Sequence, residues 1–301
     1  MKRYGKKLMS GALALGLVFA MGTTAFAASD AEYTKNENVY ARLEQNGEVS
    51  GAYVVNTFHV TKEGEITDHG DYGKVQNLTN LEAIESDKDE HTFTAGEGKF
   101  YYQGDIEKAD LPWTFEIVYT LDGEEVEKEE LAGQEGELEI RVRVRQNPAF
   151  ADETFFQSYM LQTSVTLDPA LCDQIHAEGV AAGENASASD EEQQAGTTIQ
   201  TTMTDAGANE NITFIVYPGT EADLVITADV ENFEMDDISI NGTAAEFPKS
   251  YVSDENTNVE KTTFIISAEG VTIPEPVVEE AAVEEPGFLD KLLDLFKGLF
   301  G

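Results

Sequence analysis

An alternation of apolar and charged residues with a period of two is the feature that most constrains the fold of this chain. Leu138, Ile140, Val142 and Val144 alternate with one glutamate and three arginines. Successive side chains of a β-strand point to opposite faces, so this pattern predicts a half-buried strand. A helix needs apolar residues three and four positions apart, and that spacing is nearly absent before residue 288. The chain is therefore expected to be mainly β.

Similar segments recur along the chain, with turn signals between them. Asn46-Gly47 predicts a hairpin with a type I′ turn, because both central positions of that turn need positive φ, and Asp122-Gly123 predicts another tight turn. Short strands at this spacing favour an antiparallel, immunoglobulin-like β-sandwich over parallel α/β folds. The expected strands cover residues 39–43, 53–60, 99–102, 113–119, 138–145, 159–167, 198–203, 212–217, 224–230 and 238–240.

Changes in composition divide the chain into segments. The polar stretch 28–37 is expected to be a leader, and the small, polar and acidic stretch 176–197 a mobile surface excursion. A possible strand at 262–268 interrupts an otherwise irregular region that ends in a Pro- and Glu-rich spacer. The expected segments are a signal peptide at 1–27, an N-terminal β module at 38–110, the sandwich at 111–246, an irregular acidic linker at 247–287 and an amphipathic helix at 288–300.

The N-terminus has the three parts of a secretory signal peptide. Four basic residues within the first seven precede an apolar stretch at residues 8–21, and the small-x-small site Ala25-Phe26-Ala27 follows. A retained membrane anchor is the alternative, but the apolar stretch is shorter than the ~20 residues that span a bilayer. We expect a secreted protein that begins at Ala28.

The charge balance limits the possible partners. The chain has 58 acidic and 19 basic residues, and four of the basic ones belong to the signal, so the mature chain carries 15 basic residues and a net charge of −43. Such a field repels nucleic acid and anionic membrane surfaces. Solubility and cation binding are both possible reasons for it.

No catalytic, cofactor-binding or metal-ligating residue is assigned from the sequence, and no cofactor is predicted. Cys172 is the single cysteine, which excludes an intramolecular disulfide, and its acidic surroundings favour a buried thiol over a catalytic pair with His176. Asp68-His69-Gly70-Asp71 is the best local metal cluster, with a hydrated turn as the alternative. The segment 87–90 has carboxylates but lacks the glycine and distal glutamate of a calcium loop.

Two further surface features have alternative interpretations. Arg141, Arg143 and Arg145 form a basic stripe that either binds an anionic ligand or pairs across strands with the glutamates at 124, 125, 127 and 129. The aromatic run Phe100-Tyr101-Tyr102 is expected in the core and not on a carbohydrate-binding surface.

The C-terminal segment 288–300 is the most amphipathic part of the chain. Its polar face holds two aspartates and two lysines, and its length is too short to span a bilayer. We expect a helix that docks on a membrane surface or an envelope protein, with folding back onto the body as the alternative. The expected docking residues are Phe288, Leu289, Leu292, Leu293, Leu295, Phe296, Leu299 and Phe300.

Several stretches of the chain together carry a family resemblance. They are Val39-Tyr40 with Gly47, Tyr53-Val54-Val55-Asn56, Asp71-Tyr72-Gly73, residues 100–104, Leu111-Pro112-Trp113, residues 123–142 and residues 226–242. These stretches resemble a family of uncharacterised secreted or membrane-tethered proteins from Gram-positive anaerobic bacteria of the Firmicutes/Clostridia type. The resemblance covers most of residues 38–243 and implies an envelope location, but it supplies no reaction and no catalytic residues.

The leading hypothesis is a secreted, cell-envelope-associated, non-enzymatic binding or accessory protein whose C-terminal helix docks to a membrane or partner. One alternative is a secreted carboxylate-based hydrolase, which would need convergent acids in a cleft. Another is a calcium-dependent adhesin or matrix protein, which the excess of acids suggests.

Overall fold

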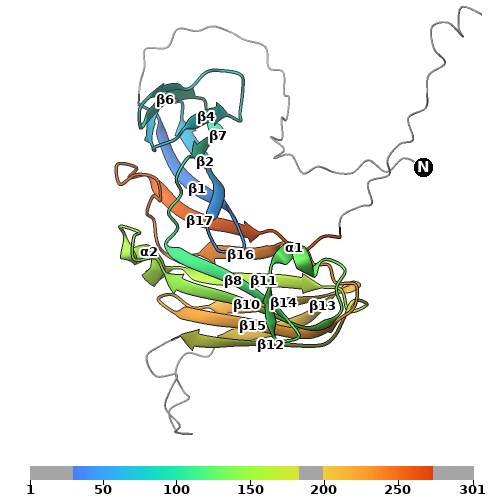
Figure 1. Cartoon of the computed structure of the whole chain (residues 1–301). Helices are drawn as coiled ribbons and strands as arrows, with labels where there is room; N and C mark the ends of the chain where they lie inside the picture. The colour runs from blue at the N-terminus through green and yellow to red at the C-terminus, as the bar shows by residue number, and fades with distance from the viewer. Residues whose placement is uncertain (1–29, 183–198, 274–301) are drawn as a thin grey trace, which may run out of the picture.

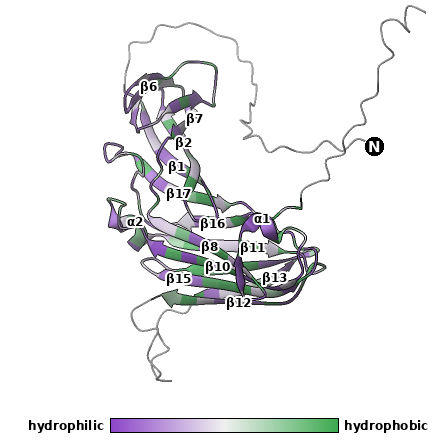
Figure 2. Cartoon of the chain, viewed as in Figure 1, coloured by the Kyte–Doolittle hydropathy of each residue, from purple (hydrophilic) through white to green (hydrophobic). Residues whose placement is uncertain are grey.

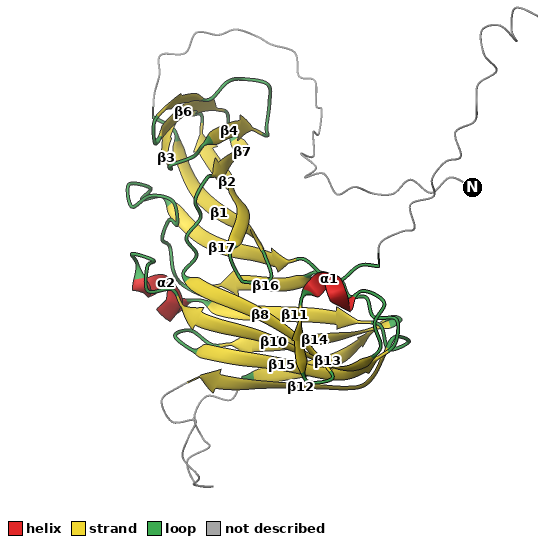
Figure 3. Ribbon diagram, viewed as in Figure 1, coloured by secondary structure: helices red, strands yellow, loops and turns green. Residues whose placement is uncertain are grey.

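The computed structural model describes residues 30–182 and 199–273 (Figure 1). These residues are mainly β, which confirms the fold class expected from the alternation, and their helices are short (Figure 3). The helices are α1 (Lys128–Leu131) and α2 (Glu153–Ser158). The strands are β1 (Glu32–Leu43), β2 (Val49–Lys62), β3 (Gly64–His69), β4 (Lys74–Asn77), β5 (Glu85–Asp87), β6 (Glu90–Ala95), β7 (Gly98–Ile106), β8 (Trp113–Leu121), β9 (Glu124–Val126), β10 (Gly136–Gln146), β11 (Met160–Leu167), β12 (Cys172–Ala182), β13 (Gln200–Ala206), β14 (Asn209–Val216), β15 (Glu221–Val230), β16 (Ile238–Thr243) and β17 (Val259–Ala268).

Three sheets contain these strands. One nine-stranded sheet has the order β13-β14-β11-β16-β17-β1-β2-β7-β4, a five-stranded sheet the order β12-β15-β10-β8-β9, and a three-stranded sheet the order β3-β6-β5. The ladders between these strands are antiparallel except that of β1 with β17, where Val39 lies beside Phe264 in parallel register. The nine-stranded sheet therefore continues from β1, β2 and β7 into the C-terminal strands without a break (Figure 1).

The three-stranded sheet covers one end of the nine-stranded sheet through an aromatic core. Phe93 of β6 stacks on Phe100 of β7 with ring centroids 4.4 Å apart, and Phe58 of β2 meets Phe93 edge to face at 5.2 Å. Phe100 and Tyr102 are buried, as expected for a core segment.

The five-stranded sheet faces the other end of the nine-stranded sheet. Trp113 of β8 contacts Phe264 of β17 and Tyr159, which precedes β11, with ring centroids 5.2 and 5.9 Å apart. Polar and apolar residues alternate along β8, β10 and β15 (Figure 2). Ile140 and Val142 of β10 are buried, as the alternation predicts.

The predicted hairpin at Asn46-Gly47 is present between β1 and β2, but its predicted turn type is wrong. Only Gly47 of this pair has a positive φ, 81°, and its Cα lies so close to Phe115 of β8 that an added Cβ would fall 1.6 Å from the carbonyl oxygen. Asp122 and Gly123 both have positive φ, 53° and 82°, as a type I′ turn requires.

Three expected irregular segments need correction. The leader 28–37 overlaps β1, which begins at Glu32 because the charged side chains on its inner face are paired in the core. The excursion 176–197 begins as edge strand β12, whose small residues suit the close approach of Ile199 to Gly179. The linker 247–287 contains β17, a central strand with an alternating buried face.

Other expectations fall on residues that the structure does not describe. The signal peptide at 1–27 and the amphipathic helix at 288–300, with all its docking residues, lie outside the described ranges. Within 30–182 and 199–273, neither helix is long and apolar enough to cross a membrane.

Candidate functional site

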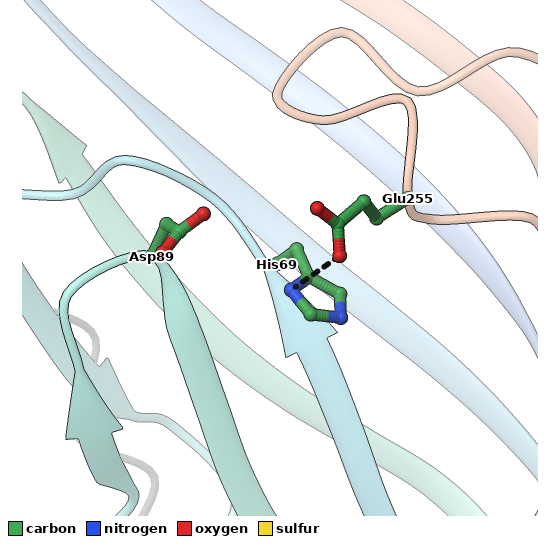
Figure 4. Close-up of side chains that lie close together, drawn as sticks. All are labelled: His69, Asp89 and Glu255. Atoms are coloured by element: carbon green, nitrogen blue, oxygen red, sulfur yellow. Dashed lines mark ion pairs between the residues drawn. The ribbon is translucent and has the colours of Figure 1, made fainter.

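A cluster of three potential metal ligands lies where the three-stranded sheet meets the loop before β17. His69 ends β3, Asp89 lies in the turn between β5 and β6, and Glu255 belongs to the loop between β16 and β17 (Figure 4). One ligand atom from each residue lies within 4.8 Å of the other two. The Nδ1 atom of His69 is 3.4 Å from a carboxylate oxygen of Glu255.

Hydrogen bonds to the backbone of His69 and Asp89 hold these two ligands in place. The side chain of Asn256 donates to the carbonyl of His69 at 2.7 Å and accepts from its N–H at 3.0 Å. The N–H of Gly70 donates to the carbonyl of Asp89 at 2.8 Å. Asn256 therefore attaches the loop before β17 to the end of β3, which brings Glu255 to His69.

The donor set of this cluster determines which ions suit it. One imidazole nitrogen and two carboxylate oxygens match zinc-type divalent ions, whereas calcium prefers six to eight oxygen ligands. Asp89 and Glu255 are exposed and His69 is half-buried, so water can complete the coordination.

The sequence identified His69 but not its neighbours. Asp68 of the expected cluster is buried and turned to Lys35, and Asp71 is exposed. The structure instead brings His69 together with Asp89, from the segment compared with a calcium loop, and Glu255, from the expected linker. Nothing local in the sequence connects positions 69 and 255, because their contact depends on the parallel pairing of β17 with β1.

The basic stripe on β10 is fully engaged in ion pairs, but with other acids than expected. Arg141 pairs with Glu139, Arg143 with Glu116 of β8, and Arg145 with Asp223 of β15, each at 2.7 Å. Arg143 and Arg145 pair across strands, and Arg143 lies directly opposite Glu116 in the register, whereas Arg141 pairs with a neighbour on its own strand. The structure therefore favours ion pairing over an anion site, and the partners expected at 124–129 are wrong.

An acidic row crosses the outer face of the five-stranded sheet near the other end of β10. Glu137 of β10 lies opposite Asp229 of β15, and Asp229 lies opposite Asp173 of β12. An open hollow there is lined by Glu137, Asp229 and His176, among other residues. Like charges in cross-strand positions repel each other, so this row attracts cations without forming a defined site.

The lone thiol has no catalytic setting. Cys172 is buried, and burial together with the nearby Asp168 carboxylate raises its pKa to about 11. The thiol is therefore protonated at neutral pH, which agrees with the expectation of a buried thiol and not a nucleophile.

The titratable groups whose pKa values are shifted most lie in the protein interior. Burial is the main cause that raises the pKa of Tyr72 and of Tyr102 above the ordinary range. Both side chains lie beside Asp68. Asp68 forms a buried ionic cluster with Lys35 and Glu37. The sequence analysis missed this cluster. Its signal was the alternation of β1, which continues backward from Val39 to place Glu37 and Lys35 on the buried face.

Comparison with solved structures gives distant similarities. No family model matches the sequence, and no curated protein matches it. The yeast delta-COP-I mu-homology domain has a TM-score of 0.40 at 7% identity, covering 81% of this chain and 98% of that one. The collagen adhesin CNA from S. aureus has a TM-score of 0.24 at 11% identity, with 79% and 92% covered. The N-terminal domain of the Streptococcus gordonii adhesin Sgo0707 has a TM-score of 0.27 at 8% identity, with 76% and 61% covered. These low TM-scores carry no argument about function.

Proposed function

We propose that this chain is a secreted, cell-envelope-associated, non-enzymatic binding or accessory protein. The resemblance to secreted or membrane-tethered proteins of Gram-positive anaerobes and the N-terminal signal pattern support the location. The observation that carries the non-enzymatic part is that Lys35, Tyr72 and Tyr102 are sealed in the core. Catalytic groups with perturbed pKa values normally line an accessible cleft, so perturbation in a closed core supports a structural role.

The domain organisation proposed for this scaffold is an N-terminal β module at 38–110 and an immunoglobulin-like sandwich at 111–246. The change from β7, which ends at Ile106, to β8, which begins at Trp113, supports a boundary near residue 110. The facing antiparallel sheets support the sandwich type. The strand β17 adds to both parts, since it lies between β16 and β1.

The attachment that we propose is through the C-terminal segment 288–300. Its apolar face would bury Phe288, Leu292 and Phe296 with their neighbours against a membrane surface or an envelope protein. Each fully buried side chain of this size contributes about 1.5–3 kcal/mol. The Pro- and Glu-rich spacer before it would hold the helix away from the acidic body.

Fractionation of the native cells tests this proposal. The full chain and a chain truncated after Pro286 are compared in membrane, wall and medium fractions, and their melting temperatures are measured. We expect the full chain in an envelope fraction and the truncated chain in the medium, with equal melting temperatures. Retention of the truncated chain in the envelope would refute the docking role. A large loss of stability on truncation would indicate that the segment folds back onto the body.

A second candidate function is cation-dependent binding, and the cluster of His69, Asp89 and Glu255 favours it. An ion there would bridge β3, the turn after β5 and the loop before β17, and would stiffen the contact that Asn256 makes. The donor set favours a zinc-type ion over the calcium that the acidic composition suggested.

Melting temperatures with added Zn²⁺, Mn²⁺ or Ca²⁺ test this second function. An ion at 100 times its dissociation constant stabilises the folded state by about 2.7 kcal/mol. We expect Zn²⁺ to raise the melting temperature of the natural chain and to have no effect on His69→Ala. His59→Ala is the matched control, since His59 lies on β2 and is not one of the three clustered residues. An equal zinc response in His69→Ala would eliminate the site.

A further inference from the structure

Three ionisable side chains form a sealed cluster between the nine-stranded and three-stranded sheets. Lys35 and Glu37 are neighbours on the inner face of β1, and Asp68 belongs to β3. Their exposed fractions are 1%, 0% and 1%. Two carboxylates and one ammonium leave a net negative charge in the core. Burying a charged group costs desolvation free energy unless the group is paired and hydrogen-bonded or loses its charge.

The geometry brings a nucleophile to a carboxyl carbon. Nζ of Lys35 lies 2.8 Å from each carboxylate oxygen of Asp68 and 3.0 Å from Oε1 of Glu37. A nitrogen equally close to both oxygens lies about 3 Å from the carbon between them, which is the separation of a near-attack arrangement. The amine, the carboxyl carbon and a possible proton acceptor are therefore already in place.

We propose that Lys35 and Asp68 condense into an intramolecular amide bond that links β1 to β3, with Glu37 as the proton-transfer group. The ammonium of Lys35 gives a proton to Glu37, and the free amine attacks Cγ of Asp68. The C–N bond forms and one C–O bond of Asp68 breaks. The departing oxygen takes up two protons that were on the lysine nitrogen and leaves as water. Glu37 delivers one of these protons to the oxygen. One ammonium and one carboxylate become one amide and one water, and Glu37 recovers its charge. No oxidant or co-reactant is needed.

The surroundings suit both the reaction and its product. The hydroxyl of Tyr102 hydrogen-bonds to Oδ2 of Asp68, so it can stabilise negative charge that develops on that oxygen during attack. The ring of Phe58 lies beside the amine, with its centroid 5.7 Å from Nζ, and helps to exclude water. In the product, Tyr102 donates to the amide carbonyl and the amide N–H faces Glu37.

Glu37 keeps partners after the lysine loses its charge. Its carboxylate accepts hydrogen bonds from the hydroxyl of Ser250 at 2.6 Å and from the N–H of Tyr251 at 2.8 Å. The condensation removes one positive and one negative charge from the core and leaves only this hydrogen-bonded carboxylate. The product therefore has fewer buried charges than the reactant, which favours the bond once water has left.

The protonation of Lys35 explains why a second carboxylate is required. Burial lowers the pKa of Lys35, but the carboxylates of Glu37 and Asp68 outweigh burial and hold its pKa above the ordinary value. The ammonium does not attack until it loses a proton, and Glu37 is the base within reach. The bond is therefore expected to form during maturation of the folded chain and not in the unfolded one.

Such a bond would give this chain an internal covalent cross-link, which a single cysteine cannot provide as a disulfide. Lys35 and Asp68 are 33 residues apart and belong to different sheets. A cross-link of this kind restricts the unfolded chain, as a disulfide does. A secreted scaffold with a single cysteine has no disulfide within the chain to serve that purpose.

Intact mass under denaturing conditions tests the proposal on the purified full chain. We expect a mass lower than the sequence mass by one water. Trypsin does not cleave after an amide-linked lysine, so we also expect one branched peptide in which the segment ending at Arg42 is joined to residues 63–74. A folded chain at its full sequence mass would overturn the proposal, and so would a water loss without that branched peptide.

Variants assign the roles within the cluster. Lys35→Arg keeps the charge but removes the primary amine, and we expect it to have its full sequence mass. Glu37→Gln keeps the shape but removes the base, and we expect a loss of more than tenfold in the cross-linked fraction after equal incubation. Lys128→Arg is the matched control, because Lys128 pairs with Glu269 at 2.9 Å on the surface, and this variant should still lose water. A water loss in Lys35→Arg, or full cross-linking in Glu37→Gln, would contradict these roles.

Discussion

Trp113 and Phe264 meet edge to face with ring centroids 5.2 Å apart, and they join the two facing sheets of the C-terminal sandwich. Trp113 begins β8 in the five-stranded sheet, whereas Phe264 lies in β17 of the nine-stranded sheet. Phe264 is also the residue beside Val39 in the parallel ladder of β1 and β17. One aromatic side chain therefore connects the sandwich core to the strand that continues into the N-terminal part.

The first prediction concerns this contact. Phe264→Ala should lower the free energy of unfolding by about 3–5 kcal/mol, because it leaves a cavity beside Trp113, Tyr159 and Phe155. Guanidinium denaturation followed by the fluorescence of the single tryptophan measures the change. Leu81→Ala is the control, since Leu81 is fully exposed and should give no change. An equally small effect in both variants would contradict the packing.

A second prediction concerns the ion pair of Asp152 with Lys249. Burial raises the pKa of Asp152, but hydrogen bonds from Lys249 and Thr154 outweigh it and hold this pKa below the ordinary value. The pair therefore stabilises the fold above the ordinary carboxyl pKa, and this contribution is lost as the pH falls through the lowered pKa. Since Asp152 is a quarter exposed, screening limits the effect to about 0–1 kcal/mol.

Two variants separate this charge from helix capping. Asp152 also caps α2 by accepting the N–H of Thr154 at 3.0 Å. Asp152→Asn retains a capping oxygen and should lose only the ion pair, whereas Asp152→Ala should lose about 1 kcal/mol more at every pH. Thermal melts of both variants across an acid series measure the difference. A stability gap between Asp152→Asn and the natural chain that persists at the acid end would refute the assignment.

The third prediction concerns the thiol of Cys172. Because burial and Asp168 raise its pKa to about 11, the thiol should resist alkylation by iodoacetamide in the folded chain at mildly alkaline pH. The same reagent should label it fully in denaturant. Mass spectrometry counts the added groups. Rapid labelling of the folded chain would show that the thiol is accessible and ionised.

The fourth prediction concerns the N-terminus that the signal pattern predicts for the mature chain. The small-x-small site at Ala25-Phe26-Ala27 predicts cleavage that leaves Ala28 first. N-terminal sequencing of the exported protein is the measurement, and recovery of a chain that still begins at Met1 would contradict it.

The alternation of side chains predicted most of the strands, because each strand of the sandwich buries one face. Leu138, Ile140, Val142 and Val144 are all buried, as this pattern requires. The same rule failed on β1, where the buried face continues through Glu37 and Lys35. Charged residues on a core face resemble a polar leader unless their partner is known, and Asp68 lies on another strand. The alternation did not predict the edge strand β12 either, because its small residues bury little apolar surface.

The candidate sites depend on contacts that no local pattern encodes. The pairing of β17 with β1 is parallel and joins the two ends of the described chain. It brings Glu255 to His69 and Ser250 to Glu37, contacts that span 186 and 213 residues. Composition predicted a linker at 247–287 because its charges and prolines dominate the window. Short-range signals identified His69 as a candidate but did not identify its neighbours.

We infer that β17, placed between β16 and β1, makes the N-terminal and C-terminal β regions one cooperative scaffold. Pulsed hydrogen exchange across a guanidinium series, followed in peptides from residues 50–106 and 212–230, tests it most directly. We predict that both sets of peptides lose protection in one transition with the same midpoint. Loss of protection in residues 50–106 at a clearly lower denaturant concentration, while residues 212–230 stay protected, would contradict the claim.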